Sequence, residues 1–566
     1  MTARASKGGE ATKLQLRPRV WKEPAEEAPC RQACPAGIDI PRYVRCIAEG
    51  KYDQALAVIC ERIPFPSVCG RVCFHPCEAE CRLGEIGGVE GPVAIRALKR
   101  FVSERASFPN KPKAAKPSGK KVAVVGAGPA GLTAAYYLAR LGHSVTVFES
   151  LPQAGGMMRV GIPAYRLPRQ TLDAEIEGIK AAGVEIKTNT RVKSIADLRQ
   201  QGYDAVFVAI GAHKGSRMGV EGEDSAGVID SISFLGAVNA GKKVKIGDRV
   251  AVIGGGNSAV DAARAARRLG AKEVTILYRR GRAQMPAHAV EVDEALAEGV
   301  TIRFLAAPIR IALEGKGLRL ECTGMRLGPP DESGRPAPEP VPGSEFSMQV
   351  DTVISAIGQV PDVPSDPMIR LTDRGLLEAN PDNLATTAKG IFAGGDAVTG
   401  PASVIGAIAG GRKAAAAIDK YLGGRGRIDK ALARPEREVR PLVASVPGER
   451  RPIASLPVAE RLSGFAEVEL GLSEQAAVDE AKRCLGCDLA IVADPTKCVG
   501  CTLCQLRCSF KFNKVFQPSQ AKIRIEKLGA GIAHNISFAD ECQSCGLCAR
   551  YCLYGALSQQ KKEALK

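Results

Sequence analysis

The sequence lacks several features that would place it in a membrane, outside the cell or on nucleic acid. It contains no apolar run near the roughly 20 residues that a membrane helix needs. Residues 1–20 lack the apolar segment of a secretory signal. Aromatic residues make up only 5% of the chain, and the lysines and arginines that give a net charge of +17 form no stripe with them. We therefore expect a cytoplasmic protein with no membrane span and no nucleic-acid partner, whose basic charge lies on a solvated surface or meets an acidic protein.

Histidine is also scarce, whereas cysteine is abundant. The five histidines show no metal-ligand spacing, but sixteen of the 19 cysteines stand in closely spaced groups. Thiols in a cytoplasmic protein are poor candidates for disulfides and good candidates for metal ligands. We expect Cys46, Cys60 and Cys322, which stand outside the groups, to be structural. The predicted metal ligands are Cys30, Cys34, Cys69, Cys73, Cys77, Cys81, Cys484, Cys487, Cys498, Cys501, Cys504, Cys508, Cys542, Cys545, Cys548 and Cys552.

The C-terminal cysteines repeat the pattern CxxCxxCxxxC, once at 498–508 and once at 542–552. Three thiolates at this spacing surround one corner of a cubane, whereas zinc sites use two separated pairs. We therefore expect two [4Fe–4S] clusters. In such twin motifs the fourth cysteine of each run binds the other cluster. One predicted ligand set is Cys498, Cys501, Cys504 and Cys552, and the other is Cys508, Cys542, Cys545 and Cys548.

Six further cysteines of these groups lie between residues 30 and 81, apart from Cys46 and Cys60. We expect them on turns between helices at 40–49, 52–62 and 92–107. Thiolates grouped in this way suit an iron–sulfur cluster or zinc. Six thiols cannot complete two sites of four ligands, so some ligands are missing from this segment.

A strand, a glycine-rich turn, a helix and a second strand follow one another in residues 120–149. The first glycine permits the tight turn, the second lets the backbone approach a pyrophosphate, and the third lets the helix pack on the strand. The unpaired N–H groups at the start of the helix then face the phosphates. An acid ends the second strand, where a carboxylate suits the ribose of FAD or NAD. The predicted nucleotide ligands are Gly126, Gly128, Pro129, Ala130, Gly131 and Glu149.

A second glycine-rich turn of the form GxGxxA follows a strand at 249–253. Its next strand ends in Arg279 and Arg280 rather than in an acid. Arginines pair with the 2′-phosphate of NADPH, so this turn favours NADPH over NADH. The alternative is that both arginines are merely solvated at the end of a strand. The predicted ligands are Gly254, Gly255, Gly256, Asn257, Ser258, Arg279 and Arg280.

The order of these segments predicts a multidomain α/β protein. An α-helical N-terminal ferredoxin domain and a C-terminal α+β dicluster ferredoxin domain flank two Rossmann-like domains, one inserted in the other. Segments 203–211 and 351–358 share a pattern and predict one strand in each nucleotide module. The expected divisions are a flexible arm (1–29), a helical iron–sulfur domain (30–105), a linker (106–119), an FAD domain (120–245 and 346–423), an NADPH domain (246–345), a connector (424–483) and a dicluster domain (484–566).

Residues 30–423 resemble the glutamate synthase small-subunit family. That family includes the NADPH module of dihydropyrimidine dehydrogenase and the large subunit of NADH-dependent ferredoxin:NADP transhydrogenase. The resemblance is carried by CPAGIDIPRYV, PFPSVCGRVCFHPCEAEC, GPVAIRALKRF, VAVVGAGPAGL, GIPAYRLP, VIGGGNSAVDAAR and IFAGGDAV. It implies that FAD binds at Gly126–Gly131, Glu149, Gly156, Arg166, Gly395 and Asp396, and that NADPH binds at the second turn.

The family usually holds two clusters in its N-terminal domain with the help of an RCLxC motif before the first cysteine. This chain has that motif at Arg483–Cys487 instead. Our hypothesis is that Cys484 and Cys487 fold back to join Cys30 and Cys81, while Cys34, Cys73 and Cys77 hold another cluster. Cys69 and Lys99 are the candidates for the open fourth position, although a protonated lysine cannot bind a metal. The alternative is that Cys484 and Cys487 form a separate zinc or structural knuckle.

The C-terminal segment is similar to ferredoxin-like subunits that accompany tungsten aldehyde oxidoreductases and benzoyl-CoA reductases, and we expect a hairpin through 523–528 and 532–538.

The resemblance and the motifs together indicate an NADPH-linked oxidoreductase subunit. It would divide a hydride pair on FAD and relay single electrons through [4Fe–4S] clusters to or from a partner subunit or a ferredoxin, as part of a hetero-oligomer. No catalytic acid or nucleophile is predicted, and no cysteine pair adjoins either nucleotide turn to form a disulfide relay. The alternatives are a glutamate synthase small subunit, a redox-inert assembly scaffold and a zinc-bearing nucleic-acid binder.

Overall fold

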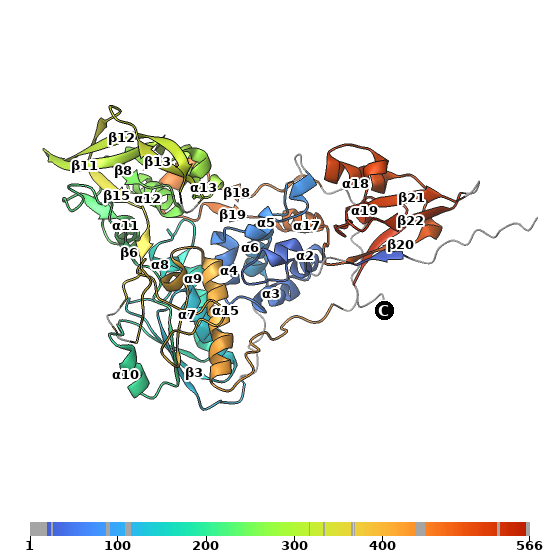
Figure 1. The fold of residues 1–566 in the computed structure, drawn as a ribbon, viewed down its shortest axis with the longest axis horizontal. Helices are drawn as coiled ribbons and strands as arrows, with labels where there is room; N and C mark the ends of the chain where they lie inside the picture. Colours follow the sequence, from blue (N-terminus) through green and yellow to red (C-terminus); the bar gives the residue numbers. More distant parts are fainter. Residues whose placement is uncertain are drawn as a thin grey trace, which may run out of the picture.

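The computed structural model describes residues 20–23, 27–86, 91–107, 115–315, 317–331, 334–363, 366, 368–436, 448–528 and 532–561. The molecule is elongated, with two α/β domains at one end, a helical domain in the middle and a small α+β domain at the other end (Figure 1). Most of the predicted arm, residues 1–19, and the middle of the predicted linker, residues 108–114, lie outside the described residues. In the part of the chain that is described, no helix is both long and apolar enough to cross a membrane.

The helical domain contains the three predicted helices and three short ones. The spacing of Ile40, Tyr43, Val44 and Ile47 places four buried side chains on one face of α2, which explains why this segment is helical. Cys30, Cys69 and Cys77 lie inside short helices rather than on turns, so the expected placement of these cysteines is wrong. The elements are α1 (Pro29–Gln32), α2 (Ile40–Ala48), α3 (Tyr52–Cys60), α4 (Pro66–Val72), α5 (Pro76–Ala79), η1 (Gly84–Ile86) and α6 (Ile95–Arg105).

The first α/β domain is built on a parallel sheet of five strands in the order β17-β5-β2-β3-β4. Strand β5 and residues 122–125 of β2 are apolar and buried, because helices cover both faces of the sheet. The last helix of the domain begins at Val404, because the side chain of Ser403 accepts the N–H of Gly406 and caps it. The elements are β2 (Lys121–Val125), α7 (Pro129–Arg140), β3 (Ser144–Phe148), α8 (Met157–Val160), α9 (Arg169–Ala181), β4 (Val184–Lys187), α10 (Ile195–Gln200), β5 (Ala205–Val208), β17 (Ile391–Ala393), α14 (Asp396–Thr399) and α15 (Val404–Tyr421).

The second α/β domain has its own parallel sheet, in the order β10-β9-β8-β15-β7. Its strand β15 pairs with β8 on one side and with β7 on the other. The predicted boundaries at 245/246 and 345/346 are therefore wrong, because segments on both sides of them hydrogen-bond into this sheet. The elements are β7 (Val228–Asp230), α11 (Ser231–Asn239), β8 (Arg249–Ile253), α12 (Asn257–Arg268), β9 (Glu273–Tyr278), η2 (Arg282–Gln284), α13 (Ala289–Ala297), β10 (Thr301–Phe304) and β15 (Thr352–Ser355).

The chain passes between the two α/β domains through a short antiparallel pair, β6 (Lys214–Gly215) and β16 (Gln359–Val360). A four-stranded antiparallel sheet extends the second domain. The segment 328–345 is rich in proline and glycine, a composition that predicts a loop, but it contains one of the strands of this sheet, so that prediction is wrong. The strands are β11 (Ala306–Glu314), β12 (Gly317–Pro330), β13 (Pro336–Pro340) and β14 (Phe346–Val350).

The described parts of the predicted connector, residues 424–436 and 448–483, are packed against the domains that they join. Its last helix, α17, lies on α2 and α6 of the helical domain, and α16 lies on α12. Glu467 and Glu469 form ion pairs with Arg71, Arg96 and Arg100 of the helical domain. The elements are β18 (Ala454–Ser455), α16 (Val458–Leu462), β19 (Glu469–Gly471) and α17 (Glu474–Lys482).

The C-terminal domain contains the predicted hairpin, formed by β21 and β22. Its other sheet has the order β1-β20-β23, and β1 comes from the N-terminal arm. The prediction of a flexible arm is therefore wrong at Val20–Lys22, which pairs with the far end of the chain. The elements are β1 (Val20–Lys22), β20 (Ala490–Ala493), η3 (Pro495–Lys497), α18 (Leu503–Asn513), η4 (Pro518–Gln520), β21 (Ile523–Lys527), β22 (His534–Phe538), α19 (Leu547–Arg550) and β23 (Leu557–Gln560).

Candidate redox site

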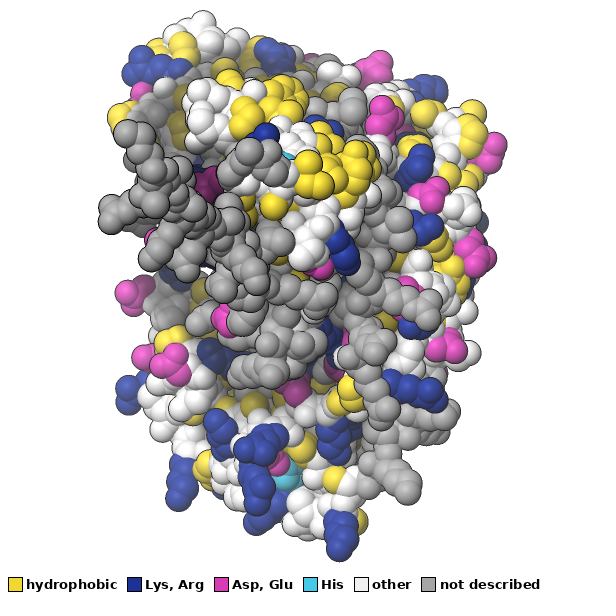
Figure 2. All heavy atoms as spheres, turned by 90° about the vertical axis from the view of Figure 1, so that its right-hand side faces the viewer, with side chains coloured by type: hydrophobic (Ala, Val, Ile, Leu, Met, Phe, Trp, Pro, Cys, Tyr) yellow, Lys and Arg dark blue, Asp and Glu magenta, His cyan; other side chains and the backbone are white. Residues whose placement is uncertain are grey.

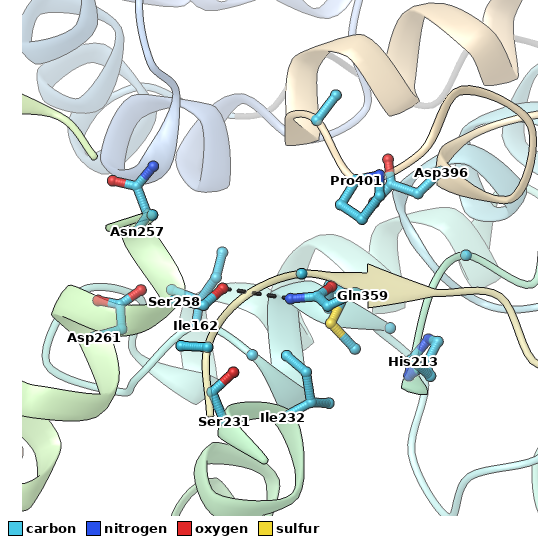
Figure 3. Close-up of a pocket in the computed structure, with 18 of the residues that line it drawn as sticks. Ile162, His213, Ser231, Ile232, Asn257, Ser258, Asp261, Gln359, Asp396 and Pro401 are labelled. Atoms are coloured by element: carbon cyan, nitrogen blue, oxygen red, sulfur yellow. Dashed lines mark hydrogen bonds between the residues drawn. The ribbon is translucent and has the colours of Figure 1, made fainter. Parts of the chain in front are cut away.

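A cavity of about 1060 Å³ is lined by both glycine-rich turns and by two residues of the helical domain, Val72 and Phe74. Figure 3 shows Asn257, Ser258 and Asp261 on one side of it and Asp396 and Pro401 on the other. The space is large enough for two nucleotide cofactors that meet in the middle. Val72 and Phe74 flank Cys73 in sequence, so the helical domain contributes to the wall of the cavity beside one of its cysteines.

The first turn forms a backbone cradle at the start of α7. The N-cap residue is Gly128, and no side chain caps the helix, so its first N–H groups are free to face an anion. A Cβ on Gly156 (φ +52°) would lie 2.7 Å from the Cα of Gly128, so these two backbones approach more closely than larger residues would allow. Both glycines, with Pro129 and Ala130, line the cavity. This cradle fits the pyrophosphate of a dinucleotide.

Glu149 is buried at the end of β3 and lines the same cavity. Its carboxylate accepts the N–H of Ala127 at 2.8 Å and the N–H of Leu151 at 2.8 Å. The acid therefore holds the turn in shape while it faces the place where a ribose would lie. His213 lies nearby, and burial lowers its pKa, which keeps the imidazole neutral.

Gly395 and Asp396 come to the cavity at the start of α14. Burial raises the pKa of the Asp396 carboxyl to about 6, although the N–H of Ala402 opposes this shift. A carboxylate held in such a pocket is ready to accept hydrogen bonds from hydroxyl groups of a ligand. The predicted FAD ligands at both ends of the first domain thus face one space.

The second turn lies across the cavity at the start of α12. The side-chain oxygen of Asn257 accepts the N–H of His288 at 3.1 Å. Ser258 is 3.4 Å from the side-chain amide of Gln359, which reaches it from β16 (Figure 3). Sequence reasoning did not select His213 or Gln359, because neither belongs to a motif and only the fold brings them to the cavity.

The two arginines that follow β9 have different environments. Arg280 is buried, pairs with Asp331 and donates to the carbonyl of Pro336 at 2.8 Å. Arg279 is exposed and lines the cavity. Only Arg279 is therefore placed to meet a 2′-phosphate without losing a buried ion pair. Arg335, from the loop before β13, also lines the cavity and had not been predicted.

Arg166 lies between the two α/β domains. It donates to Asp261 at 2.7 Å and is 3.1 Å from Glu291, both in the second domain. The neighbouring Tyr165 stacks on Arg264 and Arg268 and donates to Asp261 at 3.2 Å. Arg166 lines the cavity, but its contacts make it a clamp between the domains as well as a candidate flavin contact.

The C-terminal cysteines form two groups, as the twin motif predicts. The Cys498 group contains Cys498, Cys501, Cys504 and Cys552, and the Cys508 group contains Cys508, Cys542, Cys545 and Cys548. Burial and then the other thiols of each group raise the pKa of Cys504 and Cys548. Backbone N–H groups donate to Cys508 at 3.2 Å and to Cys552 at 3.3 Å. Such N–H donors stabilise the negative charge of sulfur ligands.

The Cys34 group lies under α6 and contains Cys34, Cys69, Cys73 and Cys77. Lys99 projects into it. Burial opposes the charge of Lys99, but the surrounding thiols outweigh that effect and raise the pKa of its ammonium. A charged lysine offers no lone pair to a metal, so Cys69 is the residue of this group that is able to fill the fourth position.

The Cys30 group joins the two ends of the chain. A cavity of about 30 Å³ is lined by Cys30, Cys81, Cys484 and Cys487. Burial, then Cys484, Cys487 and Cys81, raise the pKa of the Cys30 thiol. Buried, mutually repelling thiols are stable as thiolates only when a metal takes up their charge, so the donor set fits a metal centre.

Within the described residues, no three His, Cys, Asp or Glu side chains lie close enough together to hold a single metal ion. Cys46, Cys60 and Cys322 are buried outside the four groups. The chemistry of all four groups, four thiols each, is that of iron–sulfur ligation.

Comparisons with known proteins agree with this arrangement. Residues 120–411 match the family model described as pyridine nucleotide-disulphide oxidoreductase, and residues 24–110 match dihydropyrimidine dehydrogenase domain II, 4Fe-4S cluster. The chain is 45% identical over 508 residues to the NADP(+)-dependent formate dehydrogenase subunit beta of Moorella thermoacetica, which covers 82% of this chain and 71% of that one. It is 42% identical to the NADPH-Fe(3+) oxidoreductase subunit beta of Geobacter sulfurreducens, over 81% and 75% of the two chains. It is 35% identical to the glutamate synthase [NADPH] small chain of Escherichia coli, over 69% and 88%.

Proposed function

This chain belongs to the pyridine nucleotide-disulphide oxidoreductase family as an NADPH-dependent flavin and iron–sulfur electron-transfer subunit, and we propose which of its residues carry that function. The first turn, Glu149, Gly156, Gly395 and Asp396 hold FAD. The second turn and Arg279 hold NADPH, with Arg280 as an internal support. The observation that carries the proposal is the single cavity that both turns line together with Val72 and Phe74 of the helical domain.

Bound flavin supplies the conversion between hydride transfer and single-electron transfer. The residues of this chain position the two nucleotides relative to each other. The start of α7 and the start of α12 fix the phosphates of the two nucleotides at opposite ends of the cavity. Gln359 and Ser258 occupy the space between them, and Arg166 keeps the two domains at one relative orientation. No acid–base residue is required, because hydride transfer depends on orientation.

The chain works with at least one other redox subunit, as its relatives are named subunits of larger enzymes. We propose that its partner is the catalytic subunit of a complex that oxidises or reduces a substrate, and the relative named as subunit beta of a formate dehydrogenase supports this proposal. The match to that relative covers more of this chain than the match to the glutamate synthase small chain, which supports this assignment over glutamate synthase. We place the complex in the cytoplasm, where reduced thiols of this number persist.

The partner docks at the Cys498 group in this proposal. Cys501 is the exposed member of the group, and Val499, Leu553 and Tyr554 beside its cysteines are exposed apolar residues. Figure 2 looks at this end of the molecule and shows apolar side chains gathered on the face. An exposed cysteine ligand surrounded by apolar surface suits the docking of a redox subunit. The interface would bring the electron acceptor of that subunit close to the ligand and exclude water.

An anaerobic titration tests the function directly. Addition of NADPH to the purified chain will bleach the flavin absorbance, and broad absorbance of the clusters will fall in a later phase. NADH at the same concentration will act more slowly. Flavin that stays oxidised in the presence of NADPH would contradict the proposal and favour a redox-inert scaffold.

A further inference from the structure

Cys484 and Cys487 lie at the end of α17, far from the N-terminal cysteines in sequence. Because α17 packs on α2 and α6, the segment that follows it enters the helical domain. The two thiols there share a small cavity with Cys30 and Cys81. The helical domain by itself therefore offers only half of this group of four thiols.

Polar contacts fix the segment around these two cysteines from both neighbouring domains. Asp488 accepts two hydrogen bonds from Arg45 of α2, at 2.7 and 2.8 Å. From the C-terminal domain, the side-chain amide of Gln559 donates to the carbonyls of Leu485 and Gly486, at 2.8 and 3.0 Å. The loop is thus held between the helical domain and the C-terminal domain, and its thiols are positioned rather than free.

Cys487 also adjoins the Cys508 group. Its Sγ lies 3.9 Å from the carbonyl oxygen of Cys545. After burial, the largest influences on the Cys487 thiol are Cys484 and Cys545, and all three effects raise its pKa. Arg82, next to Cys81, donates to the carbonyl of Gln543 at the same junction.

The remaining neighbours extend the series in both directions. On one side, Cys77 of the Cys34 group is among the thiols that raise the pKa of Cys30, and Val72 and Phe74, which flank Cys73 in sequence, line the nucleotide cavity. On the other side, Cys504 of the Cys498 group is among the thiols that raise the pKa of Cys548. The contact of Cys487 with Cys545 is the direct link between the Cys30 group and the Cys508 group, and Cys501 of the Cys498 group is exposed.

We propose that Cys30, Cys81, Cys484 and Cys487 hold one [4Fe–4S] cluster, and that this cluster is the junction through which electrons pass between the nucleotide half and the C-terminal half. This inference rests on the electron-transfer function proposed above. One electron crosses at a time: the Cys30 site is oxidised by one electron as the Cys508 site is reduced by one, and no proton or atom is transferred. Without the two cysteines of the C-terminal segment, the C-terminal clusters have no iron–sulfur neighbour in the helical domain.

The test compares the full-length double variant C484S/C487S with wild type and with C46S, which changes a buried cysteine outside the groups. We expect wild type and C46S to contain about 16 iron atoms per chain and the double variant about 12. NADPH will still bleach the flavin of the double variant. Rapid-freeze EPR after NADPH addition will show reduced C-terminal clusters in wild type within milliseconds to seconds but not on that timescale in the variant.

Three results overturn the inference. Unchanged iron in the double variant, or about one zinc per chain in wild type that the variant lacks, assigns Cys484 and Cys487 to a separate knuckle. An iron content of about 12 atoms per chain in wild type leads to the same assignment. This measurement is informative even where the double variant fails to fold. Failure of the electron-transfer function is distinguishable, because it shows as unbleached flavin in wild type regardless of the iron count.

Discussion

The sulfur of Cys487 lies 3.9 Å from the backbone carbonyl of Cys545, although the two residues belong to different groups of cysteines. This contact joins the helical domain to the C-terminal domain at their redox-active residues rather than at a remote surface. The contact places Cys487 directly against the backbone of the Cys508 group, so the two groups of cysteines are neighbours. The following predictions address separate parts of the path on either side of this contact.

The Cys34 group tests which residue completes a site of four ligands. We expect C69S to lose about four iron atoms per chain, because Cys69 is fully buried among Cys34, Cys73 and Cys77. K99M will keep its iron, because the ammonium is no ligand. It will lower the reduction potential of the site, since the nearby positive charge stabilises the reduced cluster. Iron analysis and EPR-monitored potentiometry measure both effects, and loss of iron in K99M with retention in C69S would reverse the assignment.

Arg279 tests the choice of nucleotide. The variant R279S will raise the KM for NADPH by about ten- to a hundredfold, because a charged hydrogen bond contributes about 1.5–3 kcal/mol. Its KM for NADH will change little, since NADH has no 2′-phosphate. Steady-state reduction of an artificial acceptor measures both values. Equal losses with the two nucleotides would mean that Arg279 is only a solvated residue.

Arg166 tests the clamp between the α/β domains. In R166Q, the buried Asp261 loses its charged partner, and the expected loss of stability is about 3 kcal/mol. Urea denaturation followed by flavin fluorescence measures the shift. R326Q is the control, because Arg326 pairs with Glu339 on an exposed surface away from the cavity and its loss should leave the midpoint unchanged. A normal midpoint for R166Q would leave this residue with a role at the flavin alone.

Glu175 of α9 predicts a dependence of stability on pH. Burial raises its pKa to about 7, although the N–H groups of Ser67 and Val68 oppose the shift. The folded state therefore binds this proton more tightly than the unfolded state does, so stability falls as the pH rises from about 4.5 to about 7. Thermal melts across this range will show a flatter profile for E175Q than for wild type. E177Q, on the exposed side of the same helix, should keep the wild-type profile.

Leu553 tests the proposed docking face. L553E will slow electron transfer to the partner subunit, because a charge replaces an exposed apolar side chain next to Cys552. Bleaching of the flavin by NADPH will be unchanged. Leu313 has the same 69% exposure on the antiparallel sheet at the other end of the molecule, so L313E is a matched control. If both variants transfer electrons to the partner at the wild-type rate, the partner binds elsewhere.

Local motifs predicted the local structure well. The strand, turn and helix at Gly126 and at Gly254 are where the sequence expects them, because glycine spacing and apolar runs act within about 30 residues. Local motifs could not predict that β15 pairs with β8, because two similar apolar strands are distinguished only by their neighbours in the sheet. The sequence also did not predict that Arg280 is buried, because its ion-pair partner, Asp331, comes from a loop with no motif.

The packing of α17 (Glu474–Lys482) on α2 (Ile40–Ala48) has a consequence for biosynthesis. A ribosome adds about 5–20 residues per second, so α17 is synthesised tens of seconds after the helical domain on which it packs. During that interval Cys30 and Cys81 are exposed without the cysteines that accompany them in the finished protein. A site with all four cysteines is therefore complete only after Cys487 has been synthesised, and Cys30 and Cys81 must stay reduced until then.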